Sequence, residues 1–240
     1  MTEGWEDRAA DWVRFARTEG HDAYWRYRDR FFELLPPPAE QALEVGCGEG
    51  RVCRDLRARG YAVTGLDAST ALVAAAREAD PTGSYLVGAA EELPFEASTF
   101  ELVVTYNSLM DVADMPSAVR EIARVLVPGG RFCACVLHPI ADAGRFEPAA
   151  DGWVFVISEP YLAERDYEIV SDRDGIRFTF RSRRYPLEAY ARALEQAGLL
   201  IESLREPVVS APERVGKPPD RWDHLPMFLH FRSAKAATTS

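Results

Sequence analysis

The chain has 240 residues, of which 47% are hydrophobic and 28% charged, and its formal net charge is −10 at pH 7. These proportions are ordinary for a globular protein with a full core, while the acidic balance disfavours binding to a nucleic-acid backbone. The acidic N-terminal stretch has no apolar signal core, and no apolar run reaches membrane-spanning length. We therefore expect one cytoplasmic domain over residues 1–240, monomeric or homodimeric, that binds neither nucleic acid nor membrane.

The cysteines are too widely spaced to suggest a metal site. None belongs to a Cys-x-x-Cys pair, and the chain has only four histidines to accompany them. Structural zinc sites combine closely spaced cysteines and histidines. No metal is therefore expected, and the thiols of Cys47, Cys53, Cys133 and Cys135 are expected to be reduced.

Residues 1–38 open the chain with an aromatic-rich, amphipathic segment. Its apolar spacing predicts two helices, interrupted near Gly20 and ended by three consecutive prolines at 36–38. Most of its aromatic rings suit a hydrophobic core. The alternative is a helical lid over a ligand site, in which the ligand is touched by Tyr24, Trp25 or Arg28.

From residue 41 the chain alternates short apolar runs with helical patterns, which is typical of a parallel sheet covered by helices on both faces. Strands are expected at 41–45, 62–66, 84–88, 100–105, 131–137, 199–204 and 226–232. Helices are expected at 51–59, 70–79 (capped by Ser69), 116–126 and 187–197. Residues 141–183 interrupt the rhythm after the fifth strand, and their β-rich runs predict an antiparallel insertion.

A glycine-rich turn, Glu44-Val45-Gly46-Cys47-Gly48-Glu49-Gly50, joins the first strand of this pattern to its first helix. Glycine lets a ligand approach the main chain closely, and the N–H groups of the following helix face that ligand. The dinucleotide fingerprint Gly-x-Gly-x-x-Gly requires a third glycine where this chain has Arg51. An NAD-dependent oxidoreductase is therefore a disfavoured alternative.

The acidic-x-Gly-x-Gly-x-Gly turn resembles motif I of the class I S-adenosylmethionine (SAM)-dependent methyltransferases. Three further blocks continue the resemblance: Gly88-Ala89-Ala90-Glu91-Glu92-Leu93-Pro94-Phe95, Phe100-Glu101-Leu102-Val103-Val104 and Val125-Leu126-Val127-Pro128-Gly129-Gly130-Arg131. A weaker likeness, to the small-molecule type of this family, continues through Tyr185-Pro186-Leu187, Ala197-Gly198-Leu199 and Arg205-Glu206-Pro207. The resemblance implies an α/β, three-layer Rossmann-like fold. Its seven strands would be ordered 3-2-1-4-5-7-6, with strand seven antiparallel.

The implied activity is transfer of a methyl group from SAM to a small-molecule acceptor, which yields S-adenosylhomocysteine (SAH). A protein that binds SAM without methyl transfer, such as a cyclase or a binding module, is the alternative. In the family the glycine turn cradles the amino-acid end of SAM, and the carboxylate at the end of the second strand binds the ribose. The expected cofactor-binding residues are Glu44, Gly46, Cys47, Gly48, Gly50, Asp67, Ala68, Ala89, Ala90, Glu91, Tyr106 and Asn107.

One of these positions departs from the family pattern. The aspartate that normally accepts the adenine amino proton is replaced by Ala89. Loss of one net hydrogen bond corresponds to about 1 kcal/mol. The backbone of Ala90 still reaches the ring, and Glu91 is a substitute acceptor.

The acceptor would lie above the fourth and fifth strands, beside the insertion. His138 directly follows the fifth strand and is the candidate catalytic base, with a hydrogen-bonded structural histidine as the alternative. Tyr106 and Asn107 are expected at the methionine end of SAM, and Met110 and Asp111 are further candidates on the acceptor side. Asp111 could equally cap a helical turn.

The insertion at 141–183 is expected on the substrate side of the domain. Its aromatic residues either wall an apolar acceptor pocket or form the core of the insertion itself; they are Phe146, Trp153, Phe155 and Tyr161. At its end, Arg181, Arg183 and Arg184 form either a solvated strand face or a clamp for an anionic acceptor.

Overall fold

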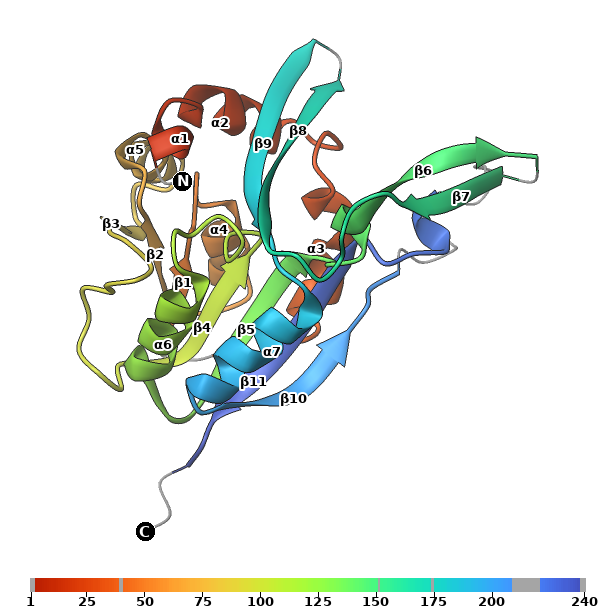
Figure 1. Cartoon of the computed structure of the whole chain (residues 1–240). Coiled ribbons are helices and arrows are strands. Elements are labelled where there is room, and N and C mark those ends of the chain that lie inside the picture. Colours follow the sequence, from red (N-terminus) through yellow and green to blue (C-terminus); the bar gives the residue numbers. More distant parts are fainter. Residues whose placement is uncertain (1–2, 39–40, 151, 174, 209–220, 238–240) are drawn as a thin grey trace.

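The computed structural model describes residues 3–38, 41–150, 152–173, 175–208 and 221–237 (Figure 1). Its centre is a seven-stranded sheet with the order β10-β11-β5-β4-β1-β2-β3. Strands β1 to β5 run parallel to one another, and β11 is antiparallel to both of its neighbours, β5 and β10. Counted along the sheet strands, this is the predicted order 3-2-1-4-5-7-6, so the expected Rossmann-like fold is confirmed.

The sheet strands lie close to their predicted positions. They are β1 (Ala42–Val45), β2 (Val63–Asp67), β3 (Ser84–Val87), β4 (Phe100–Tyr106), β5 (Leu126–Leu137), β10 (Leu199–Arg205) and β11 (Phe228–Lys235). The largest difference is the start of β5, which was expected at 131. Leu126 already pairs with Phe100, and a register shift before Arg131 accommodates the Pro-Gly-Gly turn within the strand.

Helices cover both faces of the sheet and produce two hydrophobic cores. The helices on one face are α3 (Tyr24–Phe32), α4 (Arg51–Ala58) and α5 (Thr70–Ala79). Those on the other face are α6 (Met115–Val125) and α7 (Leu187–Gln196). The predicted cap of α5 is present, because the Ser69 hydroxyl accepts the N–H of Leu72 at 3.2 Å.

Three helices, rather than the two expected, precede the sheet. They are α1 (Glu3–Glu6), α2 (Ala9–Arg17) and α3. The one-turn α1 is anchored at the start of α5, where the Glu6 carboxylate accepts the Ser69 hydroxyl at 2.6 Å and the Ala71 N–H at 3.2 Å. An acidic side chain is favoured there because helix N-termini carry partial positive charge. As a result, α1 and α2 lie above the ends of the parallel strands (Figure 1).

The antiparallel insertion forms two separate hairpins that rise from this same edge of the sheet (Figure 1). Their strands are β6 (Gly144–Ala149) with β7 (Gly152–Ile157), and β8 (Arg165–Arg173) with β9 (Ile176–Arg184). Phe178 of β9 is buried against the rings of Trp5, Trp12 and Phe15, with centroid separations of 5.3–5.9 Å. The N-terminal helices therefore bridge the sheet and the second hairpin.

Candidate functional site

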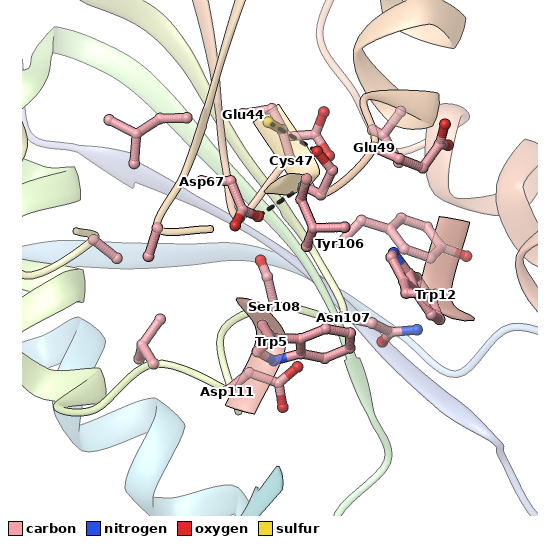
Figure 2. A pocket seen from close by; sticks show the side chains of 18 of the residues that line it. Trp5, Trp12, Glu44, Cys47, Glu49, Asp67, Tyr106, Asn107, Ser108 and Asp111 are labelled. Atoms are coloured by element: carbon pink, nitrogen blue, oxygen red, sulfur yellow. Dashed lines mark hydrogen bonds between the residues drawn. The ribbon is translucent and has the colours of Figure 1, made fainter. Parts of the chain in front are cut away.

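A cavity lies at the carboxyl ends of β1, β2 and β4, beneath α1 and α2 (Figure 2). In open α/β sheets ligands bind at this edge. Most of the expected cofactor-binding residues line it, namely Glu44, Gly46, Cys47, Gly48, Asp67, Ala68, Ala90, Glu91, Tyr106 and Asn107. Side chains that the sequence did not single out as ligand contacts complete the wall, including Trp5, Trp12, Arg51 and Ser108.

The glycine turn is packed so closely against the loop after β4 that one of its positions admits no side chain. Gly46 has φ +75°, and a Cβ added there would lie 2.3 Å from the Cβ of Ser108. The Ser108 hydroxyl in turn donates to the Val45 carbonyl at 2.7 Å. Glycine at 46 therefore allows the turn and the loop after β4 to form one continuous wall.

Two expected contact residues, Gly50 and Ala89, do not line the cavity. The space beside the Gly50 Cα is filled from behind, because a Cβ there would lie 2.9 Å from the Tyr85 ring. Gly50 also has φ +82°, a backbone conformation that favours glycine. Glycine is therefore needed at this position for packing and for backbone geometry. Ala89 is exposed, whereas its neighbours Gly88 and Ala90 face the cavity.

Glu91 is engaged elsewhere, although it lines the cavity. One oxygen of its carboxylate accepts the backbone N–H groups of Ala113 and Asp114 at 2.7 and 3.0 Å. The side chain thereby fixes the segment that leads into α6. These two hydrogen bonds weaken the hypothesis that Glu91 replaces the missing adenine acceptor.

Asp67 ties the end of β2 to the glycine turn. Its Oδ2 accepts the Gly48 N–H at 2.8 Å, and its Oδ1 accepts the Ser69 N–H at 2.9 Å. Burial raises the pKa of Asp67, while these two hydrogen bonds oppose the rise. Each oxygen keeps a second lone pair with which it can accept a further donor.

Three polar atoms around the glycine turn are buried and have no hydrogen-bond partner among the described residues. They are one carboxylate oxygen of Glu44, Nη1 of Arg51 and the hydroxyl of Tyr106. All three residues line the cavity. Burial raises the pKa of Glu44 to about 8. Because buried polar atoms need a partner and these three lie around one cavity, this part of the cavity suits a ligand that carries charged or polar groups.

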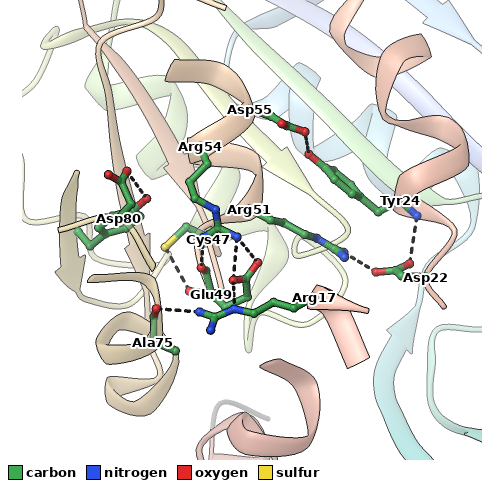
Figure 3. A network of polar contacts seen from close by, with 12 residues as sticks. Arg17, Asp22, Tyr24, Cys47, Glu49, Arg51, Arg54, Asp55, Ala75 and Asp80 are labelled. Carbon is green, nitrogen blue, oxygen red and sulfur yellow. Dashed lines mark hydrogen bonds and ion pairs between the residues drawn. The ribbon is translucent and has the colours of Figure 1, made fainter. Parts of the chain in front are cut away.

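Arg51, the first residue of α4, is held in place from the N-terminal segment (Figure 3). Its Nη2 lies 2.5 Å from Oδ2 of Asp22, and its guanidinium packs over the rings of Tyr24 and Trp12, 4.3 and 5.1 Å from their centroids. In the same region, the buried Glu49 carboxylate binds Arg17 of α2 at 2.9 Å. The N-terminal segment is thus joined to the glycine turn by two ion pairs.

None of the three residues expected to touch a ligand from the N-terminal segment lines the cavity. The Tyr24 hydroxyl and Arg28 Nη1 both bind the Asp55 carboxylate, at 2.5 and 3.1 Å, and neither residue lines the cavity, nor does Trp25. Trp5 and Trp12 of the same segment line the cavity instead. The aromatic pattern of residues 1–38 did not distinguish between these rings, because all of them occur at helical spacing.

His138 does not line the cavity, and both of its ring nitrogens have partners. Nδ1 accepts the Ile140 N–H at 3.2 Å, so the neutral ring carries its hydrogen on Nε2, which lies 3.1 Å from the Glu206 carboxylate. Burial lowers the pKa of His138, while Glu206 acts to raise it. This geometry favours the structural alternative, and a catalytic role for His138 stays a prediction without support here.

We expect His138→Ala to lower turnover less than about tenfold and to leave SAH affinity unchanged. A general base contributes about 10²- to 10⁴-fold, whereas loss of one buried hydrogen bond lowers stability by about 1 kcal/mol. Turnover, calorimetric SAH affinity and thermal unfolding of the variant check this. A hundredfold loss of turnover with normal SAH affinity, repeated in Glu206→Gln, would restore His138 as the base.

The remaining acceptor candidates are divided between the cavity and the core. Asp111 lines the cavity, whereas Met110 is buried in the core. The side chains of Arg181 and Arg183 pair with Glu168 and Glu164, at 2.7 and 3.5 Å. These pairs weaken the hypothesis of an anion clamp for Arg181 and Arg183. Arg184 is buried, its Nε and Nη1 have no hydrogen-bond partner among the described residues, and it does not line the cavity.

The insertion aromatics form a separate cluster on the first hairpin. Phe146 contacts Phe155 and Trp222 with ring centroids 5.1 and 4.9 Å apart. Neither Trp153, which is exposed, nor Tyr161 reaches the cavity lining. This arrangement does not support an apolar acceptor wall made of these rings. Only Phe146 and Phe155 pack together, as the alternative of an insertion core requires, and Trp153 takes no part in such a core.

Within the described ranges, no group of three or more His, Cys, Asp or Glu side chains is placed to hold a metal ion. No helix in the same ranges combines the length and apolar character needed to cross a membrane. The four cysteines are free and buried.

The strand order, the glycine turn and the carboxylate at the end of β2 together define a class I SAM-dependent methyltransferase fold. Residues 43–134 match the family described as "Methyltransferase domain". The chain is 30% identical over 214 residues to 27-O-demethylrifamycin SV methyltransferase of Amycolatopsis mediterranei (strain S699), covering 76% of this chain and 79% of that protein. The chain therefore belongs to the SAM-dependent methyltransferase family, and SAM is its cofactor.

Two further comparisons agree with this assignment. Malonyl-[acyl-carrier protein] O-methyltransferase of Serratia marcescens is 31% identical over 125 residues, which are 52% of this chain and 48% of that enzyme. The chain thus spans about half the length of some curated relatives that it matches. The structure of a SAM-dependent methyltransferase from Mesorhizobium loti superposes with a TM-score of 0.73 at 25% identity, over 89% of this chain and 98% of that one.

Proposed function

We propose that this protein transfers a methyl group from SAM to a small-molecule acceptor. The observation that carries the proposal is the group of unpartnered polar atoms on Glu44, Arg51 and Tyr106, beside a glycine turn that lines the cavity. The relatives named above are methyltransferases. When bound, SAM supplies an electrophilic methyl group and a sulfur leaving group.

The charges of the cavity match the two ends of the cofactor's amino-acid group. The free Nη1 of Arg51, at the N-terminus of α4, would bind the carboxylate, which that end of a helix also favours. The free oxygen of Glu44 would accept the ammonium group, whose charge favours ionisation of this buried carboxyl. Asp67 would accept the ribose hydroxyls with its remaining lone pairs.

The residues at the mouth would keep water away from the reacting groups. Trp5 and Trp12 lie over the cavity and pack on each other with centroids 5.5 Å apart. In-line methyl transfer depends chiefly on positioning and on a preorganised, dry site. The N-terminal helices would therefore act as a lid, and the second hairpin would support it through Phe178.

Calorimetric titration with SAM, SAH and NAD tests the proposal. We expect SAM and SAH to bind in a one-to-one ratio and NAD not to bind, because Arg51 fills the position of the third dinucleotide glycine. Acceptors are then sought by SAH release from a panel of neutral and cationic small molecules, which suit an acidic protein. Binding of NAD without SAM would overturn the proposal, and binding of SAM without any SAH release would favour a non-transferring binding module.

A further inference from the structure

Asp111 occupies the wall of the cavity that faces the glycine turn. In Figure 2, Asp111, Ser108 and Trp5 lie on one side of the cavity, and Glu44 and Asp67 lie on the other. The cofactor contacts proposed above all come from the turn, from α4 and from the end of β2. Asp111 belongs to none of these elements, so a cofactor on the turn would leave this carboxylate facing the ligand space beyond it.

Two hydrogen bonds from the second hairpin fix the position of Asp111. The Ser182 hydroxyl of β9 donates to its Oδ1 at 2.5 Å. The backbone N–H of Arg183 donates to the Met110 carbonyl at 3.0 Å. The backbone turn from Ser108 to Asp111 is closed as well, because the Asp111 N–H donates to the Ser108 carbonyl at 2.9 Å. The carboxylate therefore has little freedom to move.

Among the described residues, no cationic side chain forms an ion pair with Asp111. Arg8 is near enough to favour its ionised form, but the Arg8 guanidinium donates to the carbonyls of Gly4 and Thr179. Asp67 and Asp142 oppose ionisation. Tyr167 of β8 and Tyr190 of α7 also lie near enough to interact with the Asp111 carboxyl group. Burial is the largest effect and, with Asp67 and Asp142, raises the pKa of Asp111 to about 7. A carboxyl group that titrates near neutral pH is suited to accept a proton.

We propose that Asp111 is a catalytic residue, which faces the transferable methyl group and binds an acceptor that offers an O–H or N–H hydrogen to its carboxylate. The inference rests on the proposed function. The lone pair of the acceptor atom forms the new bond to the methyl carbon, and the carbon–sulfur pair remains on sulfur as SAH is formed. The acceptor proton passes to Asp111 and then to solvent. Acceptors without such a hydrogen would gain nothing from this residue.

The test uses sinefungin, a SAM analogue in which a carbon bearing an amino group replaces the methyl-bearing sulfur. Its ammonium group occupies the place of the methyl group and offers N–H hydrogens to whatever faces it. We expect Asp111→Asn to weaken sinefungin binding about tenfold or more, because the substitution removes the negative charge that attracts the ammonium group across the acceptor space. SAH, which has no group at that place, should bind the variant and the wild-type protein equally.

The same titrations as a function of pH provide a second readout. The preference of the wild-type protein for sinefungin over SAH should be greatest well above pH 7 and should fall as the pH is lowered through about 7, because Asp111 becomes protonated. In Asp111→Asn this dependence should be absent. Ser182→Ala, which removes the hydrogen bond that orients the carboxylate, should reduce the preference by a smaller factor.

The outcomes separate this inference from the proposed function. Glu168→Gln is the matched control. Glu168 lies on the second hairpin, which also carries Ser182, and its exposed carboxylate pairs with Arg181. The preference of this variant for sinefungin over SAH should equal that of the wild-type protein. An unchanged sinefungin-to-SAH ratio in Asp111→Asn, or an equal loss of both ligands, would overturn the role of Asp111 alone. Failure of the wild-type protein to bind SAH and sinefungin would overturn the proposed function itself.

Discussion

Substitution of Arg51 by lysine is expected to weaken SAH binding by about 10- to 150-fold, since a hydrogen bond to a charged group is worth about 1.5–3 kcal/mol. The lysine keeps the positive charge but loses the second nitrogen that Arg51 has free while its first one binds Asp22. The affinity for 5′-methylthioadenosine, which has the nucleoside but no amino-acid end, should not change. Calorimetric titration of both ligands checks the result.

Arg57→Lys is the matched control for this experiment. Arg57 lies on the same helix and pairs with Asp80, but it does not line the cavity. Its substitution should leave the affinities for both ligands at their wild-type values. An equal loss of SAH and 5′-methylthioadenosine in Arg51→Lys would mean that the substitution disturbs the whole turn, and no loss of either would remove Arg51 from the cofactor site.

Most strands and helices could be predicted from the sequence because local signals mark where they begin and end. Buried strands alternate with helices that carry their own caps, such as Ser69 before α5. The antiparallel edge and the strand order came from the family resemblance, since a strand of mixed pattern does not reveal its direction. The start of β5 was missed because its Pro-Gly-Gly turn is typical of a loop, whereas β5 continues through it as a bulged strand.

The cofactor side of the cavity was easier to predict than its other walls. The glycine turn and Asp67 directly follow two predicted strands of the parallel sheet, and the family resemblance assigned both of them to the cofactor. Trp5, Trp12 and Ser182 come from segments far away in the chain, and only the packing of α1 and α2 on β9 brings them to the cavity region. No local pattern distinguishes them from other core aromatics or strand serines.

Arg51 and His138 show the same limit of sequence reasoning: Arg51 lines the cavity but was not proposed as a ligand contact, and His138 was proposed as the base but does not line the cavity. Arg51 served only as evidence against a dinucleotide site, although the first residue of a helix after a glycine turn is well placed to meet a ligand. His138 was chosen because it ends a strand at the correct edge of the sheet. Its orientation depends on Ile140 and on Glu206, which is 68 residues away, and sequence spacing gives no information about that contact.

Asp67→Ala should weaken SAH and 5′-methylthioadenosine by equal factors of about 10- to 150-fold, in contrast to the selective loss expected for Arg51→Lys. Both ligands carry the ribose that Asp67 is proposed to bind, and the alanine also releases the Gly48 N–H that shapes the glycine turn. Asp67→Asn separates these two effects. Its amide offers only one oxygen, so the N–H of either Gly48 or Ser69 must face the amide nitrogen.

The comparison of the two variants determines what Asp67 contributes. If the carboxylate acts mainly by holding the turn, Asp67→Asn should lower the affinity and the unfolding temperature together, because one buried N–H group loses its acceptor. If it acts mainly on the ribose, the affinities should fall while the unfolding temperature stays near the wild-type value. Glu78→Gln, at an exposed position of α5, controls for the loss of a charge. Normal affinity for both ligands in Asp67→Ala would contradict both roles, because the cavity would then bind the nucleoside without the carboxylate that lies at its centre.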